Sequence, residues 1–202
     1  MPRTKETFEA MRETTRLKIE AAALSLFARK GLSVKVGEIA DAAGISQGLL
    51  YSHYPSKDAL IAGLIRQATE ISGRAIMEIA GGGGRAVVKI KRITNMMCGI
   101  FNDTSPVGID YFMFMVQVGL SGFRIPEESQ YSRECPSPAE SLARVIVQGQ
   151  KERSVVRGNQ FKMSVVYWAA IQGLCCYAAT GGAPLSPDPK ALNRILLKEE
   201  YL

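Results

Sequence analysis

The sequence predicts an all-α protein, because its apolar residues recur at helical spacing and the alternation typical of strands is weak throughout. Between residues 14 and 29 the apolar positions fall every three or four residues, at Ile19, Ala22, Ala23, Leu26 and Phe27. After residue 56 a longer stripe of the same kind follows, at Leu60, Leu64, Ala68, Ile71, Ala75 and Ile79. Residues at this spacing share one face of a helix, so both segments are predicted to be amphipathic helices.

Two short helices are predicted between these segments. Gly44 separates a helix over residues 37–43 from one over residues 47–53, and Ser46 is positioned to cap the second of them. Pro55 ends that second helix, because proline lacks the backbone N–H that a continuing helix needs. Together with the helix before them, they make a three-helix N-terminal domain.

The run of four glycines at residues 81–84 is the clearest breaker in the chain. Beyond it we expect helices over residues 85–102, 106–121, 138–152, 160–180 and 188–199. Residues 124–138 contain three prolines and many polar side chains, which indicates a loop. We therefore expect a small N-terminal domain over residues 1–57 and a larger C-terminal helical domain over residues 58–202.

The composition is that of an ordinary globular protein. Hydrophobic residues make up 47% of the 202 residues, enough to form a core without metals or disulfides. The net charge of +6 weakly favours a polyanionic partner. Residues 1–57 hold 9 basic and 6 acidic side chains, and the remainder holds 16 and 13, so the net positive charge is the same in both parts of the chain.

The cysteines fit neither a zinc site nor a disulfide framework by their spacing, at Cys98, Cys135, Cys175 and Cys176. We expect reduced thiols and a cytoplasmic protein. A redox switch at Cys175 and Cys176 is the alternative, although side chains of adjacent helical residues point about 100° apart and do not pair easily.

The sequence predicts no secretion signal and no membrane partner. The N-terminus lacks the apolar core of a signal peptide. Only residues 163–183 are both free of charge and long enough to span a bilayer, and the polar residues Ser164 and Gln172 interrupt them. We interpret this stretch as a buried helix.

Residues 36–57 have the layout of a helix-turn-helix. Ile39 points inward from the first helix, and the small Ala43 lets the second helix cross closely. Gly44 permits the left-handed backbone of a tight turn. Ile45 fills the angle between the helices, and Leu50 packs the second helix on the same core. The second helix then exposes Gln47, Gly48, Tyr51 and Ser52, as a helix that enters the major groove would.

This stretch resembles the TetR family of bacterial regulators. The matching residues are Ile39-Ala40, Ala43-Gly44, Ile45-Ser46, Gly48, Leu50-Tyr51, His53-Tyr54, Ser56-Lys57 and Leu60. The helix before them fits the family's first helix through Ala22-Ala23, Leu26-Phe27 and Gly31-Leu32. The resemblance is specific over residues 15–65, and beyond them it is architectural.

The resemblance implies a DNA-binding role for Ser33, Lys35, Ser46, Gln47, Gly48, Leu49, Tyr51, Ser52, His53 and Lys57. Gln47 would approach base edges, where a glutamine can pair with adenine, or contact phosphate. Gly48 would let the backbone come close to the DNA. Contacts to phosphate are implied for Tyr51, Ser52, His53 and Lys57, and Tyr54 would help to pack the domain.

Two positions depart from the family pattern. The family often has a threonine or serine just before the first motif helix, where this chain reads Ser33-Val34-Lys35 after a connection one residue shorter. Either Ser33 or Lys35 would then take over the phosphate contact. Leu49 stands where a small or polar residue is common, and it would contact a thymine methyl group or lie near the DNA backbone.

For the C-terminal domain, the resemblance implies a small-molecule effector site and a dimer interface. Candidates for the effector site are the apolar residues Met97, Phe101, Phe112, Met115, Val116, Met163, Tyr167 and Ile171, with ordinary core packing as the alternative. The dimer contact is expected over residues 138–152 and 160–180, where Trp168, Ala169, Gln172, Gly173, Cys176 and Tyr177 recur at helical spacing. The effector would swing the helix that begins after Ser56 and lower the affinity for DNA.

Three further groups each allow two interpretations. The only histidine, His53, either contacts a DNA phosphate or has a packing role in the protein. The N-terminal arm carries five basic residues, and it is either a solvated segment or an additional contact to DNA. These residues are Arg3, Lys5, Arg12, Arg16 and Lys18. A run of basic residues follows the four glycines and is either a solvated helix face or a binding site for an anionic effector. It comprises Arg85, Lys89, Lys91 and Arg92.

The function that the resemblance implies is that of a ligand-responsive transcriptional repressor, with transcriptional activation as the alternative. It would bind a palindromic, double-stranded DNA operator as a homodimer, with recognition helices about 34–36 Å apart. We expect no cofactor, no metal and no catalytic residues, because no paired carboxylates, metal cluster or nucleophile with its base stands out. An interaction module or co-regulator of the same fold that has lost DNA binding is the alternative, and an enzyme is the rival of a different class.

Overall fold

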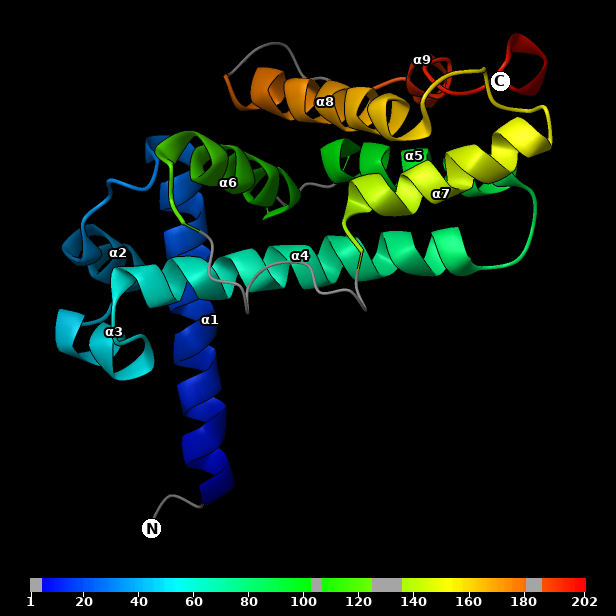
Figure 1. Ribbon diagram of the computed structural model, residues 1–202. Helices are drawn as coiled ribbons and strands as arrows, with labels where there is room; N and C mark the ends of the chain where they lie inside the picture. Colours follow the sequence, from blue (N-terminus) through cyan, green and yellow to red (C-terminus); the bar gives the residue numbers. More distant parts are fainter. Residues whose placement is uncertain (1–4, 103–106, 125–135, 181–186) are drawn as a thin grey trace. The chain divides into compact units, whose positions relative to one another are not determined.

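The computed structural model describes residues 5–102, 107–124, 136–180 and 187–202. These residues form α1 (Lys5–Lys30), α2 (Val36–Ala43), α3 (Gln47–His53), α4 (Lys57–Gly81), α5 (Ala86–Asn102), α6 (Val107–Ser121), α7 (Pro138–Lys151), α8 (Gln160–Ala179) and α9 (Pro189–Asn193), and a final 3₁₀ turn (Glu199–Tyr201) (Figure 1). Within the described ranges, extended pairing is limited to one isolated bridge between Val155 and Leu197. The predicted all-α class is confirmed.

The first helix is longer than the sequence predicts. It begins at Lys5 rather than at residue 14, so the predicted N-terminal arm is helical from Lys5 onward, and Arg3 lies outside the described residues. Arg16 forms ion pairs with Glu13 and Glu20, one turn away on either side. Pairs at this spacing stabilise a helix. Arg16 is therefore engaged within the protein, whereas Arg12 and Lys18 are exposed on the helix.

The last predicted helix is much shorter than expected. The sequence predicts a helix over residues 188–199, but α9 ends at Asn193. The chain then pairs with the loop after α7, because the Val156 N–H donates to Leu196 O at 2.9 Å and the Lys198 N–H donates to Ser154 O at 3.1 Å. These bonds take up backbone groups that a longer helix would have used internally.

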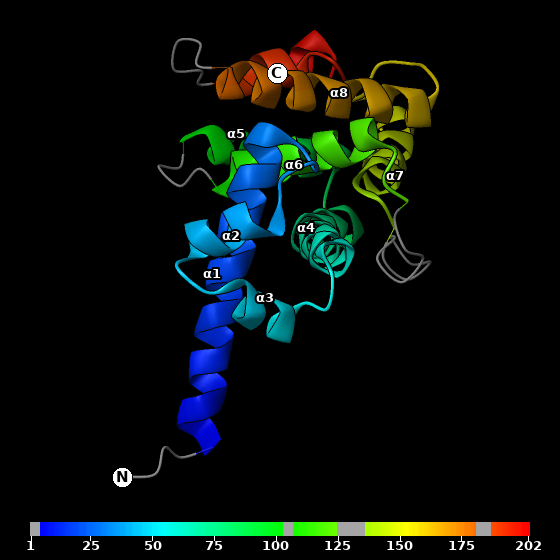
Figure 2. The ribbon, with the colours of Figure 1, turned by 90° about the vertical axis from the view of Figure 1, so that its left-hand side faces the viewer.

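The chain divides into two compact units, each described here by itself. The N-terminal unit holds residues 1–66 and 110–129. In it, α2 and α3 lie alongside α1, and the first turns of α1 extend beyond them (Figures 1 and 2). In the core of this unit, Phe27 of α1 packs against Phe114 of α6. Both side chains are fully buried, and their ring centroids are 6.0 Å apart.

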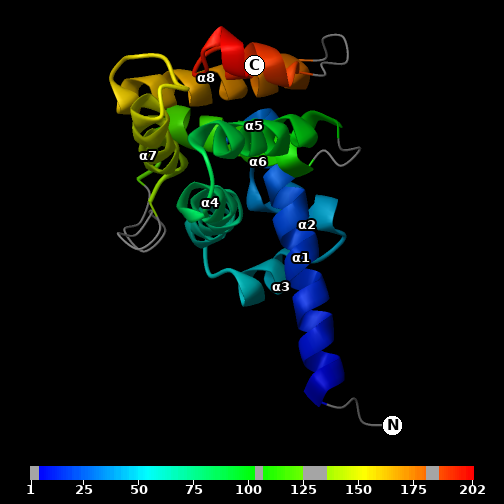
Figure 3. The ribbon, with the colours of Figure 1, turned by 90° about the vertical axis from the view of Figure 1, so that its right-hand side faces the viewer.

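The C-terminal unit holds residues 67–109 and 130–202. In it, α5 lies against α7 and α9, and α7 lies against α8 (Figure 3). Three buried polar side chains connect these helices: the Thr94 hydroxyl donates to Asn193 Oδ1 at 2.7 Å and lies 2.9 Å from the Tyr167 hydroxyl. Burial raises the pKa of Tyr167 to about 12. The predicted functional division after residue 57 stays a prediction, and the packing adds most of α6 to the N-terminal helices.

The glycine run after α4 is held by side chains of the C-terminal unit. Lys89, which is only 7% exposed, donates to Ala80 O at 2.9 Å and to Gln148 Oε1 at 3.0 Å. Gln148 Nε2 in turn donates to Gly84 O at 3.0 Å. Glu152 Oε2 accepts from the Ala86 N–H at 2.9 Å. The interpretation of the basic run as a solvated face is therefore wrong for Lys89, because its ammonium group is buried and bonded.

The described cysteines, namely Cys98, Cys175 and Cys176, are all free thiols, and Cys135 lies outside the described residues. Burial, and to a smaller degree the neighbouring Cys176, raises the pKa of Cys175 to about 12. Cys176 is only partly buried. The two adjacent thiols therefore lie in different environments on α8.

In the folded monomer, where the expected dimer contact does not cover α8, we expect Cys176 to react with iodoacetamide at pH 8 well before Cys175. The thiolate is the reacting form, and Cys175 is both buried and held as a thiol. Mass spectrometry of peptides after timed labelling measures both rates. In urea the two rates should become similar, and a faster reaction of Cys175 in the native protein would contradict the packing of α8.

Candidate nucleic-acid interface

The turn between α2 and α3 has the backbone that the sequence predicts. Gly44 adopts φ 68°, in the left-handed region that favours glycine, and its N–H donates to Asp41 O at 3.1 Å. The Ile45 N–H then donates to Ala40 O at 3.0 Å. Ser46 caps α3, because its hydroxyl oxygen accepts from the Leu49 N–H at 3.2 Å. The angle between the two helices is thus set by hydrogen bonds at both helix ends.

The α3 helix is attached to the N-terminal unit by one side. Leu50 is 0% exposed and belongs to the same core as Ile39, Ala40 and Phe27. The opposite side is open: Leu49 is 42% exposed and Tyr51 is 48% exposed. A helix fixed by one buried side chain and open on the other face can offer that face to a groove of DNA.

The predicted DNA-binding residues fall into two groups. Eight are exposed, namely Ser33, Lys35, Ser46, Gln47, Gly48, Leu49, Tyr51 and Ser52. His53 and Lys57 are half-buried. The Ser52 hydroxyl donates to Leu49 O at 2.7 Å, so it has to release this bond before it can donate its proton to a phosphate oxygen. The DNA contacts themselves stay predictions.

Lys57 has a structural contact that the sequence did not indicate. Its ammonium group donates to Leu32 O at 2.8 Å and to Val34 O at 3.3 Å. These carbonyls belong to the loop that connects α1 to α2, so Lys57 fastens this loop to the start of α4. An ammonium group has three donors, so this arrangement leaves one donor for a phosphate.

We expect Lys57→Met to have two separable effects. It should lower the free energy of unfolding by about 1 kcal/mol, because two loop carbonyls lose a charged donor. If the third donor reaches a phosphate, the substitution should also make the slope of log binding constant against log salt concentration shallower by about one unit. Urea unfolding and binding titrations from 50 to 300 mM salt would measure the two effects. Lys35→Met is the matched control for stability, since the Lys35 side chain is exposed. An unchanged slope would remove Lys57 from the phosphate contacts.

A buried polar cluster connects α1 to the end of α3. The Tyr54 hydroxyl and the Arg16 guanidinium both donate to Oε1 of Glu20, which is 6% exposed. Burial, followed by the hydrogen bond to Glu20, raises the pKa of Tyr54. Tyr54 is also the C-terminal cap of α3, with its N–H bonded to Leu50 O at 2.9 Å. The expected packing role of Tyr54 is therefore a specific contact between the recognition helix and α1.

The loop before α2 is held by Glu38. Its Oε1 accepts from the Lys35 N–H at 3.1 Å, and its Oε2 accepts from the Lys30 ammonium at 3.0 Å. The Lys35 N–H, and then Lys30, lower the pKa of Glu38. This explains how the connection that departs from the family pattern is ordered, and it leaves the side chains of Ser33 and Lys35 exposed.

The predicted effector residues are divided between the two units. Met97, Tyr167 and Ile171 are buried in the core of the C-terminal unit, and Phe101 and Met163 are half-buried there. The other three, Phe112, Met115 and Val116, are half-buried on the part of α6 that belongs to the N-terminal unit. These residues stay predictions as effector contacts.

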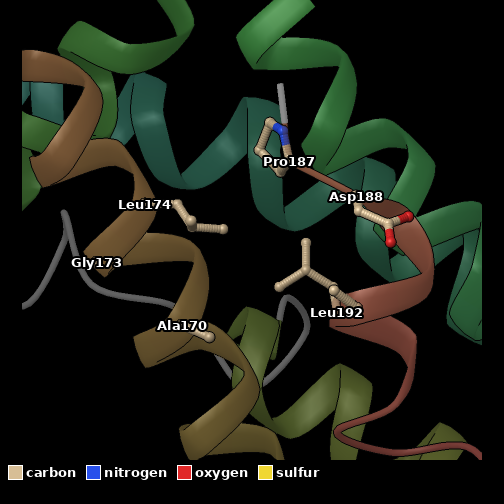
Figure 4. Close-up of a pocket in the computed structure, with 7 residues that line it drawn as sticks. Ala170, Gly173, Leu174, Pro187, Asp188 and Leu192 are labelled. Atoms are coloured by element: carbon tan, nitrogen blue, oxygen red, sulfur yellow. The ribbon is translucent and has the colours of Figure 1, made fainter. Parts of the chain in front are cut away.

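An open hollow of about 430 Å³ lies between α8 and α9 (Figure 4). Leu174 and Leu192 project into it from the two helices, and Gly173 and Pro187 are also at its wall. Asp188 stands at its edge, where its carboxylate caps α9 by accepting from the Lys190 N–H at 2.8 Å. None of the predicted effector residues lines this hollow.

The predicted dimer residues lie on a largely exposed apolar face of α8. Ala169, Gln172, Gly173 and Tyr177 are exposed, and Trp168 and Cys176 are half-buried. The same helix exposes further large apolar side chains, namely Phe161, Val165 and Val166. We call this set of residues on α8 the apolar face. A contiguous exposed apolar surface is typical of an interaction site, although the contact itself stays a prediction.

The described residues show neither a metal-binding cluster nor a membrane-spanning helix. No group of three or more His, Cys, Asp or Glu side chains in these ranges is arranged to hold a metal ion. None of the described helices has both the length and the apolar character that a membrane span requires.

Known proteins are similar to this chain in its helix-turn-helix and in its fold. Residues 19–64 match the model of the bacterial regulatory proteins of the tetR family. A transcriptional regulator from Saccharomonospora viridis, solved in complex with choline, aligns with a TM-score of 0.69 at 20% identity over 93% of this chain and 100% of its own. The MbdR regulator from Azoarcus sp. CIB also gives 0.69, at 21% identity over 91% and 97% of the two chains.

A gamma-butyrolactone receptor described as ArpA-like aligns with a TM-score of 0.68 at 18% identity over 95% of this chain and 92% of its own. A search of curated protein sequences gives no match. At these identities the solved structures establish the fold, and the family model covers the helix-turn-helix. The chain therefore has the fold of TetR-type transcription regulators, and its residues 19–64 match the model of the bacterial regulatory proteins of the tetR family.

Proposed function

We propose that the protein is a ligand-responsive transcriptional repressor that binds a palindromic operator as a homodimer in the cytoplasm. The observation that supports this most directly is the exposed face of α3, whose opposite side is fixed to the core by Leu50. Gln47 and Gly48 are at the start of this helix, the end that approaches base edges in helix-turn-helix proteins. Tyr51, Ser52 and His53 follow and contact phosphates, which sets the register on the duplex.

The apolar face of α8 supports the dimer. Val166 is 57% exposed and Tyr177 is 51% exposed, while Ala169 and Gly173 between them are small enough for a second helix to approach closely. A two-fold contact through this face, with α7 beside it, would join two copies of the chain and so supply two copies of α3 for one operator. The operator is then an approximate palindrome with half-sites about one helical turn apart.

A small molecule that prefers one of two arrangements of the dimer would act as the effector. Solved proteins of this fold include one in complex with choline and receptors for gamma-butyrolactones, so small organic ligands are compatible with the architecture. The apolar and sulfur-bearing side chains of the C-terminal unit, such as Met97 and Phe101, suit a ligand with a substantial apolar part. We propose no catalytic step in this response.

Selection of genomic DNA fragments by the purified full chain tests this function. We expect enrichment of a small set of fragments that share an inverted repeat, and a footprint over both half-sites. Recovery without any shared sequence, or no recovery at low salt, would contradict operator binding. The second of these results would favour an interaction module of the same fold, in which the exposed Leu49 contacts a protein rather than DNA.

A further inference from the structure

The side chain of Gln47, the first residue of α3, lies close to a glycine of α2, Gly37. A methyl group at position 37 would lie 2.9 Å from Nε2 of Gln47 and 3.7 Å from its Cδ. The amide end of Gln47 therefore rests against the backbone of Gly37, although Gln47 as a whole is exposed. The residue expected to read bases thus has its functional group placed by the neighbouring helix.

Neither backbone geometry nor core packing accounts for a glycine at this position. Gly37 is the second residue of α2, and it is not among the glycines with a positive φ angle. Glycine is one of the least favourable residues within a helix, so alanine would be preferred on local grounds. The atoms that a methyl group at position 37 would approach within 4 Å both belong to Gln47.

We propose that Gly37 is a specificity-determining residue, because it leaves the space in which the Gln47 amide rests and so sets which base edge that amide can reach. This inference rests on the proposed function, in which Gln47 reads bases. A glutamine discriminates bases through the direction of its paired donor and acceptor, which must match the base edge. A methyl group at 2.9 Å would displace the amide to ordinary contact at 3.4 Å or beyond and turn this direction.

The contact can be tested without DNA. The Nε2 protons of Gln47, assigned by comparison with Gln47→Ala, should shift in the NMR spectrum of the Gly37→Ala variant. The fold should be retained, since the displaced atom is the end of a flexible side chain. Gly99→Ala is the control: it also places a methyl group on a helical glycine, but that methyl group has no neighbouring atom within 4 Å, so the Gln47 resonances should stay unchanged. Unshifted Gln47 resonances in Gly37→Ala would overturn the contact whether or not the protein binds DNA.

The effect on specificity is tested with single-base variants of the selected operator. We expect Gly37→Ala to change the preference among bases by about tenfold at the base pairs where Gln47→Ala also changes it. In the Gln47→Ala background, Gly37→Ala should change nothing further, because the two substitutions act through one side chain. Unchanged preferences in Gly37→Ala, or an equal change in both backgrounds, would overturn the proposal. Failure of the unaltered protein to bind any selected DNA would instead reject the proposed function.

Discussion

Val166→Glu combined with Tyr177→Glu is expected to convert the protein to a monomer and to lower its affinity for a palindromic operator by about 100-fold or more. Both side chains lie on the apolar face of α8 and are 57% and 51% exposed. In a two-fold contact each substitution appears twice, so four carboxylates would be brought together where apolar surface is now available. The affinity falls because a monomer binds only one half-site, whereas a dimer binds both half-sites at once.

Sedimentation velocity measures the oligomeric state. Titration of full and half operators measures how much affinity is gained when one protein molecule binds both half-sites. Val88→Glu is the matched control, because it places the same charge on a valine of α5 that is 52% exposed and outside the predicted interface. We expect this control to behave like the unaltered protein. A double variant that remains dimeric would show that the two-fold contact uses another surface.

Leu50→Ala is expected to lower the free energy of unfolding by about 2–5 kcal/mol and to abolish DNA binding at temperatures where the unaltered protein binds. Leu50 is 0% exposed and is the buried side chain of the seven-residue helix α3. So short a helix is not stable alone, and its persistence depends on this anchor. The binding surface should therefore be lost together with the packing.

The neighbouring Leu49 provides the comparison for this experiment. The same substitution at Leu49, which is 42% exposed, should change the free energy of unfolding by about 0.5 kcal/mol or less. Urea unfolding followed by circular dichroism separates the two variants, and DNA titration at a temperature where both are folded measures the contact of Leu49. Equal destabilisation by the two substitutions would contradict the assignment of the inner and outer sides of α3.

The helix-turn-helix could be predicted closely because its signals are local. Gly44 ends one helix, Ser46 caps the next and Pro55 follows its end, and the predicted range of residues 47–53 is that of α3. Each of these residues acts on backbone groups within a few positions of itself. The apolar spacing around Leu50 likewise specifies the buried side without knowledge of the rest of the chain.

The contacts that orient this motif could not be predicted in the same way. Tyr54 and Glu20 are 34 residues apart in the sequence, and Lys57 reaches carbonyls that are 25 and 23 residues away. Nothing local marks these pairs, because a glutamate, a tyrosine or a lysine at such positions is also compatible with a solvated surface. Within this cluster only Arg16 and Glu20 are close in the sequence, at the i,i+4 spacing of helical ion pairs.

The end of the chain illustrates the converse problem. Leu192, Leu196 and Leu197 are all buried and fit helical spacing, yet the chain leaves the helix after Asn193. The backbone bonds to the loop after α7 replace the helical ones, and this exchange depends on a segment about forty residues away. A periodic apolar pattern shows which residues are buried and does not distinguish a helix from a turn that buries the same residues.

The glycine run after α4 has a consequence for how the C-terminal unit is stabilised. Four consecutive glycines have more conformational freedom in the unfolded chain than any other tetrapeptide, so ordering them is entropically expensive. The side chains of Lys89, Gln148 and Glu152 offset that expense by bonding the backbone on both sides of the run. Two of these three side chains belong to α7 or its cap, so the order of this corner is conditional on a helix some sixty residues further along the chain. The connection between α4 and α5 therefore becomes ordered only when α7 packs against it. A stiffer loop would have formed without this distant helix.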